Sequence, residues 1–531
     1  MQPDIWQQVD GLFERWDRAD SPGIAVGVYR NGQLEYGRGF GCAHLEQRRP
    51  IDTDTVFHVA SLSKQFTALV AAMLAEEGWF SLDDDLRDFV PELPPGPPIT
   101  YRHAIHHTSG LREQWDMLRL AGWRDADLKT TDDILSLVAR QRAANFLPGK
   151  RFQYINTAYT LVAVAIERAT GETLRAQAER LIFGPLGMRR SFFLDDHAEI
   201  VADRAQAYRT TRSGGLGIDV PHFETVGPTG LHTTIADMAL WERNLMTPSV
   251  ASAELIEAMM VPGRFAEGAV TNYAFGFVVG HHGTHATIEH AGGDAAFRAY
   301  YLRVPEERFA VLLLANFLEI GPGRIARKIV DIGLPQPNGD PARTSTRPID
   351  AKLPAGLEQI SGRYRHAASG LTCRVGPRGG QLFLESNGGS YELVPTGGLS
   401  FDFRDMDVHV SFAPAQAGAA SSMSISSGGN TVNVCERVEI DSESNAAPLE
   451  DYAGRFRSEE LDVIYTVAVQ RDILRMQGPR GMLIRLRRIS GDGFAALDTT
   501  LDVQFRRDQA GRIEGYLLSS ERAWNIGFSR V

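Results

Sequence analysis

The chain has 531 residues, 43% of them hydrophobic, and a formal net charge of −11 at pH 7. This length exceeds one ordinary domain, so we expect two or three. The acidic balance comes without a basic stripe, which argues against nucleic acid as the main partner. The three cysteines, Cys42, Cys373 and Cys435, are widely separated and odd in number, so no disulfide framework is expected.

The N-terminal stretch MQPDIWQQVDGLFERWDRAD is typical of an amphipathic helix. It has neither the basic start nor the continuous apolar run of an export signal. No apolar run in the chain is long enough to span a bilayer. We therefore expect a cytoplasmic location.

Residues 1–333 alternate strand-like and helical patterns. Two strand-like runs, 23–30 and 33–40, are joined by Asn31-Gly32, a hairpin signal. Long helical runs follow, and 296–318 contains two strands around a polar turn before a closing helix over 324–334. The pattern predicts an antiparallel sheet packed against helices, an α+β arrangement.

The stretch 334–350, LPQPNGDPARTSTRPID, is rich in proline and polar residues and is typical of a linker. Beyond it, short strands alternate with glycine-rich turns. A weak internal repeat relates LEQISGRYR at 357–365 to LEDYAGRFR at 449–457. We therefore predict two tandem antiparallel β-barrels, at 351–445 and 446–531.

The tetrad Ser61-Leu62-Ser63-Lys64 stands directly before a helical run. Serine and lysine three residues apart on a helix share one face, so an amine can sit beside a hydroxyl as its base. The chain has only five lysines against fifty arginines, and only a lysine can lose its proton at usable pH. The competing interpretation is a serine N-cap followed by a solvated lysine.

Tyr154 and Asn156 stand just before an apolar helix. In an extended segment residues i and i+2 point the same way, so the phenol and the amide could face one cleft. The tyrosine could shuttle a proton, and the amide could position the lysine or bind a substrate carbonyl. A buried structural tyrosine is the alternative.

The segment His290-Ala291-Gly292-Gly293 precedes a strand-like run. Its glycines would let a substrate lie against the strand, and an N–H near Gly293 could join that of Ser61 as an oxyanion hole. His290 would be a polar or cationic substrate contact at the edge of the site. A hairpin turn with a surface histidine is the alternative.

The order S-x-x-K, Y-x-N and H-x-G resembles the three active-site motifs of the penicillin-recognising serine hydrolases. FHVASLSKQFTA, HHTSGL, LPGKRFQYINTAY, GPTGLHTTIADMALW and YAFGF are similar to landmarks of the class C β-lactamase-like branch. The resemblance implies a β-lactamase-like or transpeptidase-like catalytic domain with Ser61, Lys64 and Tyr154 as catalytic residues. It implies no metal or organic cofactor, a small peptide, amide or ester as substrate, and β-lactams as candidate inhibitors. The chain could also form a homodimer.

A catalytic domain followed by two barrels resembles the D-stereospecific aminopeptidases of this branch. Arg298, eight residues after His290, also fits them. This implies release of N-terminal D-amino acids from peptides or amides. The rivals are an esterase, a D-amino-acid amidase, a D-carboxypeptidase or β-lactamase-like hydrolase, and a non-catalytic penicillin-binding scaffold.

One departure from those aminopeptidases concerns residues 475–490. In the aminopeptidases a loop of the last domain enters the cleft and supplies acidic character for the substrate amine. The matching stretch here, RMQGPRGMLIRLRRIS, contains no acid and several arginines, which are either a carboxylate-attracting loop or solvated strand faces. Asp294 could serve the amine instead, or be an ordinary turn aspartate.

Overall fold

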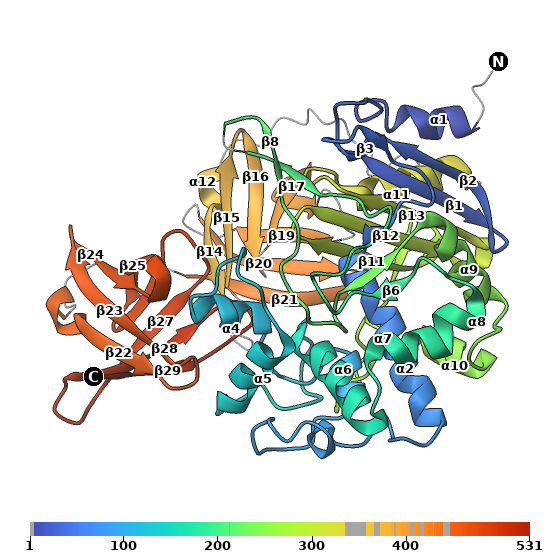
Figure 1. The fold of residues 1–531 in the computed structure, drawn as a ribbon. Helices are drawn as coiled ribbons and strands as arrows, with labels where there is room; N and C mark the ends of the chain where they lie inside the picture. The colour runs from blue at the N-terminus through green and yellow to red at the C-terminus, as the bar shows by residue number, and fades with distance from the viewer. Residues whose placement is uncertain are drawn as a thin grey trace. The chain divides into compact units, whose positions relative to one another are not determined.

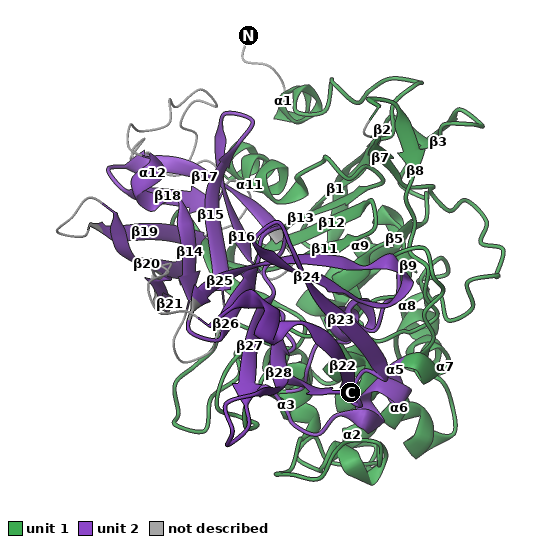
Figure 2. Cartoon of the chain, turned by 90° about the vertical axis from the view of Figure 1, so that its left-hand side faces the viewer, with its two compact units in different colours: residues 1–110, 125–133, 146–344 green, residues 111–124, 134–145, 345–531 purple. Residues whose placement is uncertain are grey.

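The computed structural model describes residues 5–211, 213–334, 357–365, 372–386, 389–403, 408–414, 419–427, 430–438 and 447–531. The chain divides into two compact units (Figure 2): residues 1–110, 125–133 and 146–344, and residues 111–124, 134–145 and 345–531. All but the first residue of the expected linker at 334–350 lies outside the described residues, and so does the expected division near 445. No helix in the described ranges is long and apolar enough to cross a membrane. The cytoplasmic location stays a prediction.

The first unit is built on a six-stranded sheet in the order β10-β11-β12-β13-β1-β2 (Figure 1). Every neighbouring pair is antiparallel. The expected hairpin at Asn31-Gly32 is present, and both residues have positive φ, at 52° and 72°. The predicted antiparallel sheet is therefore confirmed. Its strands are β1 Ile24–Arg30, β2 Gln33–Phe40, β10 Val278–His282, β11 His285–Asp294, β12 Phe297–Val304 and β13 Phe309–Ala315.

Helices cover both faces of this sheet. Successive side chains of a strand point to opposite faces, and here both faces are apolar. Val26 and Val28 face a core shared with α1 (Ile5–Gly11) and α11 (Pro322–Gly333). Gly27 and Tyr29 face α9 (Ile235–Met246), where the Tyr29 hydroxyl donates to the Ile235 carbonyl at 2.8 Å. A strand that is buried on both faces has a continuous run of apolar residues in its sequence, and β1 has such a run.

The remaining elements of the first unit surround this layered core. Its other helices are α2 Ser63–Glu76, α3 Tyr101–Ile105, α6 Thr157–Thr170, α7 Leu174–Ala178, α8 Gly184–Leu186 and α10 Ala253–Ala258. The 3-10 and π turns are η1 Ala60–Leu62, η2 Leu86–Asp88, η3 Glu179–Phe183 and η4 Pro305–Glu307. The short strands are β3 Cys42–His44, β4 Arg49–Pro50, β5 Phe57–His58, β6 Phe192–Phe193, β7 Tyr208–Thr210, β8 Leu216–Ile218 and β9 Leu231–Thr233.

The second unit contains two closed antiparallel barrels, which confirms the predicted fold class. The first barrel has β14 Gly362–Arg365, β15 Thr372–Arg378, β16 Gln381–Ser386, β17 Gly389–Gly397, β18 Ser400–Phe403, β19 Val408–Pro414, β20 Ala420–Ser427 and β21 Asn430–Arg437. The second has β22 Gly454–Ser458, β23 Val463–Gln470, β24 Ile473–Gln477, β25 Leu483–Ser490, β26 Gly493–Ala496, β27 Asp502–Arg507, β28 Ile513–Ser519 and β29 Ile526–Arg530. The short helical elements are α4 Gln114–Leu120, α12 Leu357–Ile360, η5 Leu449–Tyr452 and η6 Pro479–Gly481, and α5 Thr131–Arg140 begins in the first unit.

The internal repeat has the same structure in both barrels. Each copy is a helical turn, then a glycine at φ near 155°, then the first barrel strand. In the first barrel Gly362 lies against the guanidinium of Arg437, and in the second Gly454 lies against that of Arg530. Each arginine comes from the last strand of its barrel, which pairs with the first strand. The same glycine–arginine contact therefore joins the first and last strands in both barrels.

Candidate active site

Ser61 lies in a tight turn at the start of α2. Ala60, immediately before it, has φ of 48°, in the left-handed region that non-glycine residues seldom occupy. Ser63 holds this turn, since its hydroxyl donates to the Ala60 carbonyl at 2.6 Å and accepts from the Leu231 N–H at 3.0 Å. Ser61 is thereby half-buried and carries its hydroxyl at the helix start.

Lys64 is fully buried, and its ammonium nitrogen contacts three oxygens. Nζ lies 3.1 Å from Ser61 Oγ, 2.9 Å from Asn156 Oδ1 and 2.8 Å from the Pro228 carbonyl. The lysine is therefore no solvated surface residue, and the serine of the tetrad has an amine within hydrogen-bond reach.

The three oxygens that contact Lys64 Nζ differ in whether they can donate a hydrogen bond. The Pro228 carbonyl and the Asn156 Oδ1 can only accept, whereas the Ser61 hydroxyl can accept or donate. A neutral amine has two N–H bonds and one lone pair. If the two pure acceptors take the N–H bonds, the lone pair points at the Ser61 proton, which is the geometry of a general base.

Tyr154 stands over the same amine. Its ring centre is 4.8 Å from Lys64 Nζ, and Asn156 is the N-cap residue of α6. His107 contacts this segment at Tyr154 and at Ile155. Its imidazole centre is 4.3 Å from the Tyr154 ring, and its Nδ1 accepts from the Ile155 N–H at 3.3 Å. The structure thus brings Ser61, Lys64, Tyr154 and Asn156 together.

His290 lies on β11 near the same cluster, 6.0 Å from Tyr154 between ring centres. Its Nδ1 is 2.7 Å from the Ala291 carbonyl and must carry the proton, so Nε2 accepts from the Tyr273 hydroxyl at 2.9 Å. Burial, with a contribution from the Lys64 charge, lowers the pKa of His290 to about 3. Of the expected polar or cationic contact, the low pKa of the buried imidazole favours the polar form, and its contact with substrate stays a prediction.

Gly292 brings the backbone of β11 close to the serine turn. A Cβ at this position would lie 2.3 Å from the Val59 carbonyl, two residues before Ser61. Only glycine allows so close an approach. The strand therefore packs on η1, and Gly293 follows on the same edge.

Asp294 ends β11, and Arg298 lies near the start of β12, on either side of the turn between them. Asp294 Oδ2 accepts from the Thr229 hydroxyl at 3.4 Å, and Thr229 directly follows Pro228, the acceptor of Lys64. Arg298 Nη1 donates back to the carbonyls of Ala295 and Phe297 at 3.0 and 2.6 Å. Arg298 thus holds the turn, and it pairs with Gly293 across the β11–β12 ladder.

The arginine-rich stretch 475–490 forms the β24–β25 hairpin of the second barrel. Two of its arginines illustrate their partners within that unit. Arg485 pairs with Asp498 at 2.6 Å, and Arg480 lies over the Trp123 ring at 5.6 Å. The exposed and buried positions alternate along β25, as expected for solvated strand faces.

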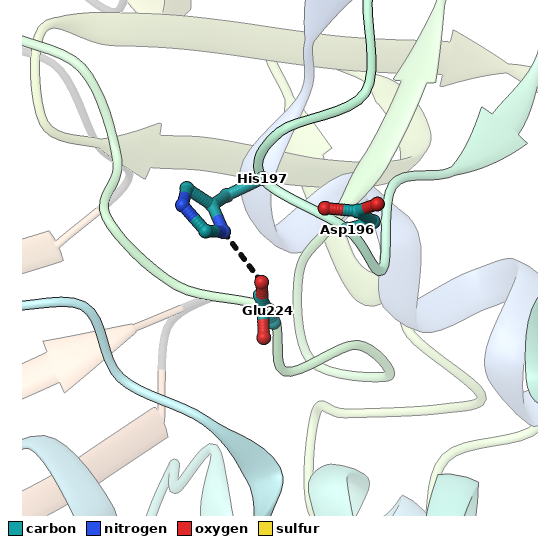
Figure 3. Close-up of side chains that lie close together, drawn as sticks. All are labelled: Asp196, His197 and Glu224. Atoms are coloured by element: carbon teal, nitrogen blue, oxygen red, sulfur yellow. Dashed lines mark hydrogen bonds and ion pairs between the residues drawn. The ribbon is translucent and has the colours of Figure 1, made fainter.

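Three side chains outside this cluster could hold a metal ion. The ligand atoms of Asp196, His197 and Glu224 lie within 4.8 Å of one another, and His197 Nδ1 is 2.5 Å from Glu224 Oε1 (Figure 3). Imidazole with two carboxylates suits several divalent metals. Residue spacing does not indicate this group, because Glu224 is distant in the chain from the other two.

Sequence reasoning missed several residues that build the site. Pro228 contributes only a carbonyl, and His107 and Tyr273 act through Tyr154 and His290. Gly276, with φ of 74°, lies so close to α2 that a Cβ would be 2.3 Å from a backbone nitrogen. All four fall within the quoted landmark stretches, but no local pattern assigns them a role.

Residues 10–332 match the protein family described as Beta-lactamase. Over 530 residues the chain is 28% identical to a D-aminopeptidase of Cereibacter sphaeroides, covering 96% of each chain. It is 26% identical to a D-aminopeptidase of Gluconobacter oxydans over 84% of this chain and 81% of that one. The structure resembles the octameric penicillin-binding protein homologue from Pyrococcus abyssi with a TM-score of 0.59 and 21% identity, covering 90% of this chain and 99% of that chain. The family match spans more than half of the chain, and the protein belongs to the Beta-lactamase family.

Proposed function

We propose that this protein is a serine hydrolase that releases N-terminal D-amino acids from peptides or amides through an acyl-enzyme on Ser61. The observation that carries the proposal is the 3.1 Å contact between the buried Lys64 Nζ and the half-buried Ser61 Oγ. A nucleophile with a base in hydrogen-bond reach is the signature of covalent catalysis.

In the proposed reaction, Ser61 Oγ attacks the acyl carbonyl while its proton passes to Lys64, with Tyr154 as a relay. The backbone N–H groups of Ser61 and of the strand near Gly293 stabilise the oxyanion. Collapse of the intermediate breaks the bond to the leaving amine, which takes the proton from Lys64 or Tyr154. A water molecule then attacks the acyl-enzyme, gives its proton to the same pair, and releases the free acid and Ser61.

Asn156 and His290 are proposed to orient the reacting groups. Asn156 Oδ1 accepts from Lys64 Nζ at 2.9 Å and so fixes the direction of the Lys64 amine. His290 is neutral and held by the protein through both ring nitrogens. We therefore assign it to shaping the site beside Tyr154 and not to charge recognition.

The D-amino-acid substrate is supported by the relatives. The D-aminopeptidase of Cereibacter sphaeroides aligns with 96% of this chain, so the alignment spans the catalytic domain and both barrels. This agrees with the resemblance drawn from the domain order.

An esterase or amidase without strict need for a free amine is the second candidate. The stretch 475–490, which matches the acidic loop of the D-stereospecific aminopeptidases, carries no acid in this chain. An enzyme lacking that charge would lose selectivity for an ammonium group.

The test is a substrate panel with purified full-length protein. D-alanine p-nitroanilide, its L-isomer, N-acetyl-D-alanine p-nitroanilide and p-nitrophenyl butyrate separate stereochemistry, free amine and ester reactivity. We expect turnover of the free D-amide to exceed that of the L-isomer and the acetylated amide. Turnover of the ester alone would refute the aminopeptidase function and favour the second candidate.

Dependence on Ser61 is tested with a fluorophosphonate and a fluorescent penicillin. Ser61→Ala should abolish both the adduct and turnover. Ser81→Ala is the control, because it removes an exposed hydroxyl that accepts from the Asp83 N–H and has no part in the Ser61 turn. Equal labelling of Ser61→Ala and the unaltered protein would contradict the assigned nucleophile, and a protein without adduct or turnover would be a scaffold.

A further inference from the structure

An enzyme that accepts only a free N-terminal amine needs an anion beside the acyl group. Resting on the proposed function, we propose that Asp294, held by Thr229 and His58, is the acceptor for the substrate α-ammonium. This assigns amine recognition to the β11–β12 turn of the catalytic domain.

A directional hydrogen-bond chain fixes the Asp294 carboxylate. The Thr229 hydroxyl donates to Asp294 Oδ2 at 3.4 Å, and His58 Nε2 lies 3.2 Å from the Thr229 Oγ1. Because the Thr229 proton points at the carboxylate, Nε2–H of His58 must be the donor to Thr229. His58 Nε2 is also 3.6 Å from Asp294 Oδ2, so two side chains hold this oxygen in place.

Asp294 keeps one oxygen for a ligand. Both of its contacts use Oδ2, and within the described residues Oδ1 has neither a hydrogen bond nor an ion pair. About a quarter of the side chain is exposed to solvent. The carboxylate is therefore positioned by the protein and remains open on one side.

The cations near Asp294 are committed to other oxygens. Lys129 Nζ donates to the carbonyls of Asp125 and Asp127 at 3.0 and 2.8 Å. Arg298 donates to the carbonyls of its own turn. Both influence Asp294 through their charge, but neither forms an ion pair with it in the described part of the chain. A partly buried carboxylate without a committed counter-ion favours a cationic ligand.

Asp294 is also linked to the catalytic cluster through the backbone at two points. Asp294 is two residues beyond Gly292, which touches the Val59 carbonyl next to the Ser61 turn. Its partner Thr229 follows Pro228, which accepts from Lys64. Asp294 therefore lies two strand residues, roughly 7 Å, from the point where β11 contacts the Ser61 turn.

The decisive variant is the isosteric Asp294→Asn, compared with the unaltered enzyme on two substrates. We expect kcat/KM for D-alanine p-nitroanilide to fall about 10- to 100-fold, because a charge-assisted hydrogen bond is lost. We expect kcat/KM for p-nitrophenyl butyrate, which has no amine, to stay within about twofold. The ester also reports that the variant is folded and that Ser61 is active.

Asp219→Asn is the matched control. Asp219 is a neighbouring acid whose charge interacts with Asp294, and its own partner is Arg209 at 3.5 Å. It should leave the amide-to-ester ratio unchanged. Equal loss in both variants would overturn the assignment and show that a general acidic field attracts the amine.

The outcomes also separate this inference from the function on which it rests. If the unaltered enzyme hydrolyses only the ester, the proposed aminopeptidase function fails. If it hydrolyses the D-amide and Asp294→Asn does so equally well, the function stands and the Asp294 assignment fails. A selective loss on the amine substrate supports both.

Discussion

The buried neutral imidazole of His290 should make the first unit lose stability in mild acid. Its pKa is about 3 in the folded protein, against an ordinary value of about 6.5 in the unfolded chain. Between these values the unfolded state binds the proton and the folded state does not. The contribution of His290 is therefore fully present above about pH 6.5 and is lost as the pH falls.

The size of the loss follows from the two pKa values. Lowering the pH from about 7.5 to about 4.5 protonates the unfolded imidazole almost completely and the folded one hardly at all. The free energy of unfolding then falls by about 3 kcal/mol through this one residue. That is a large share of the roughly 5–15 kcal/mol by which domains are stable.

The assay is urea unfolding at both pH values, followed by the helical signal in circular dichroism, which comes mainly from the first unit. His290→Gln cannot titrate, so its free energy of unfolding should fall by about 3 kcal/mol less over this range than that of the unaltered protein. His281→Gln, at an exposed position on β10, is the control and should behave as the unaltered protein does. The reasoning is refuted if His290→Gln and His281→Gln show the same pH dependence.

Three further substitutions have defined outcomes. Lys64→Arg keeps the charge but cannot give up a proton, so kcat for D-alanine p-nitroanilide should fall about a thousandfold or more, and a smaller loss would argue against an amine base. Gly276→Ala places a methyl group against the α2 backbone and should cost about 1–3 kcal/mol in urea unfolding, more than Gly268→Ala, which has positive φ but open space. Glu242→Gln removes the counter-charge of buried Arg303, 2.7 Å away, and should cost about 3–5 kcal/mol by the same assay; no change would mean that the pair is already solvated.

The sequence was sufficient for the overall architecture because its strongest patterns are local. The Asn31-Gly32 hairpin and the apolar runs of β1 and β13 follow from period and turn chemistry. The two barrels follow from the repeat at 357 and 449. The compact units do not follow chain order, however, since 111–124 and 134–145 group with the barrels. Such grouping depends on long-range contacts that no local pattern encodes.

The site shows the same division between local and long-range information. The spacing of Ser61 and Lys64 suggested the pair, but the sequence separated it from a simple serine cap only together with Tyr154, Asn156 and His290. The protonation state of His290 could not be predicted from the sequence, because it depends on burial and on Tyr273, which is 17 residues away in the chain. Likewise the role of Asp294 rests on Thr229 and His58, which only the fold brings beside it.

The arginine that closes each barrel has a consequence for how the chain completes its fold. In both barrels the first strand pairs with the last, about seventy residues later, and the closing arginine lies over an aromatic ring of the first strand. Ring closure of this length is costly in chain entropy, so the seam should form late. Until it forms, each sheet has two open edges that can pair with another molecule. A chain cut before Arg437 or before Arg530 should therefore self-associate, even though Ser61 and its surroundings are intact.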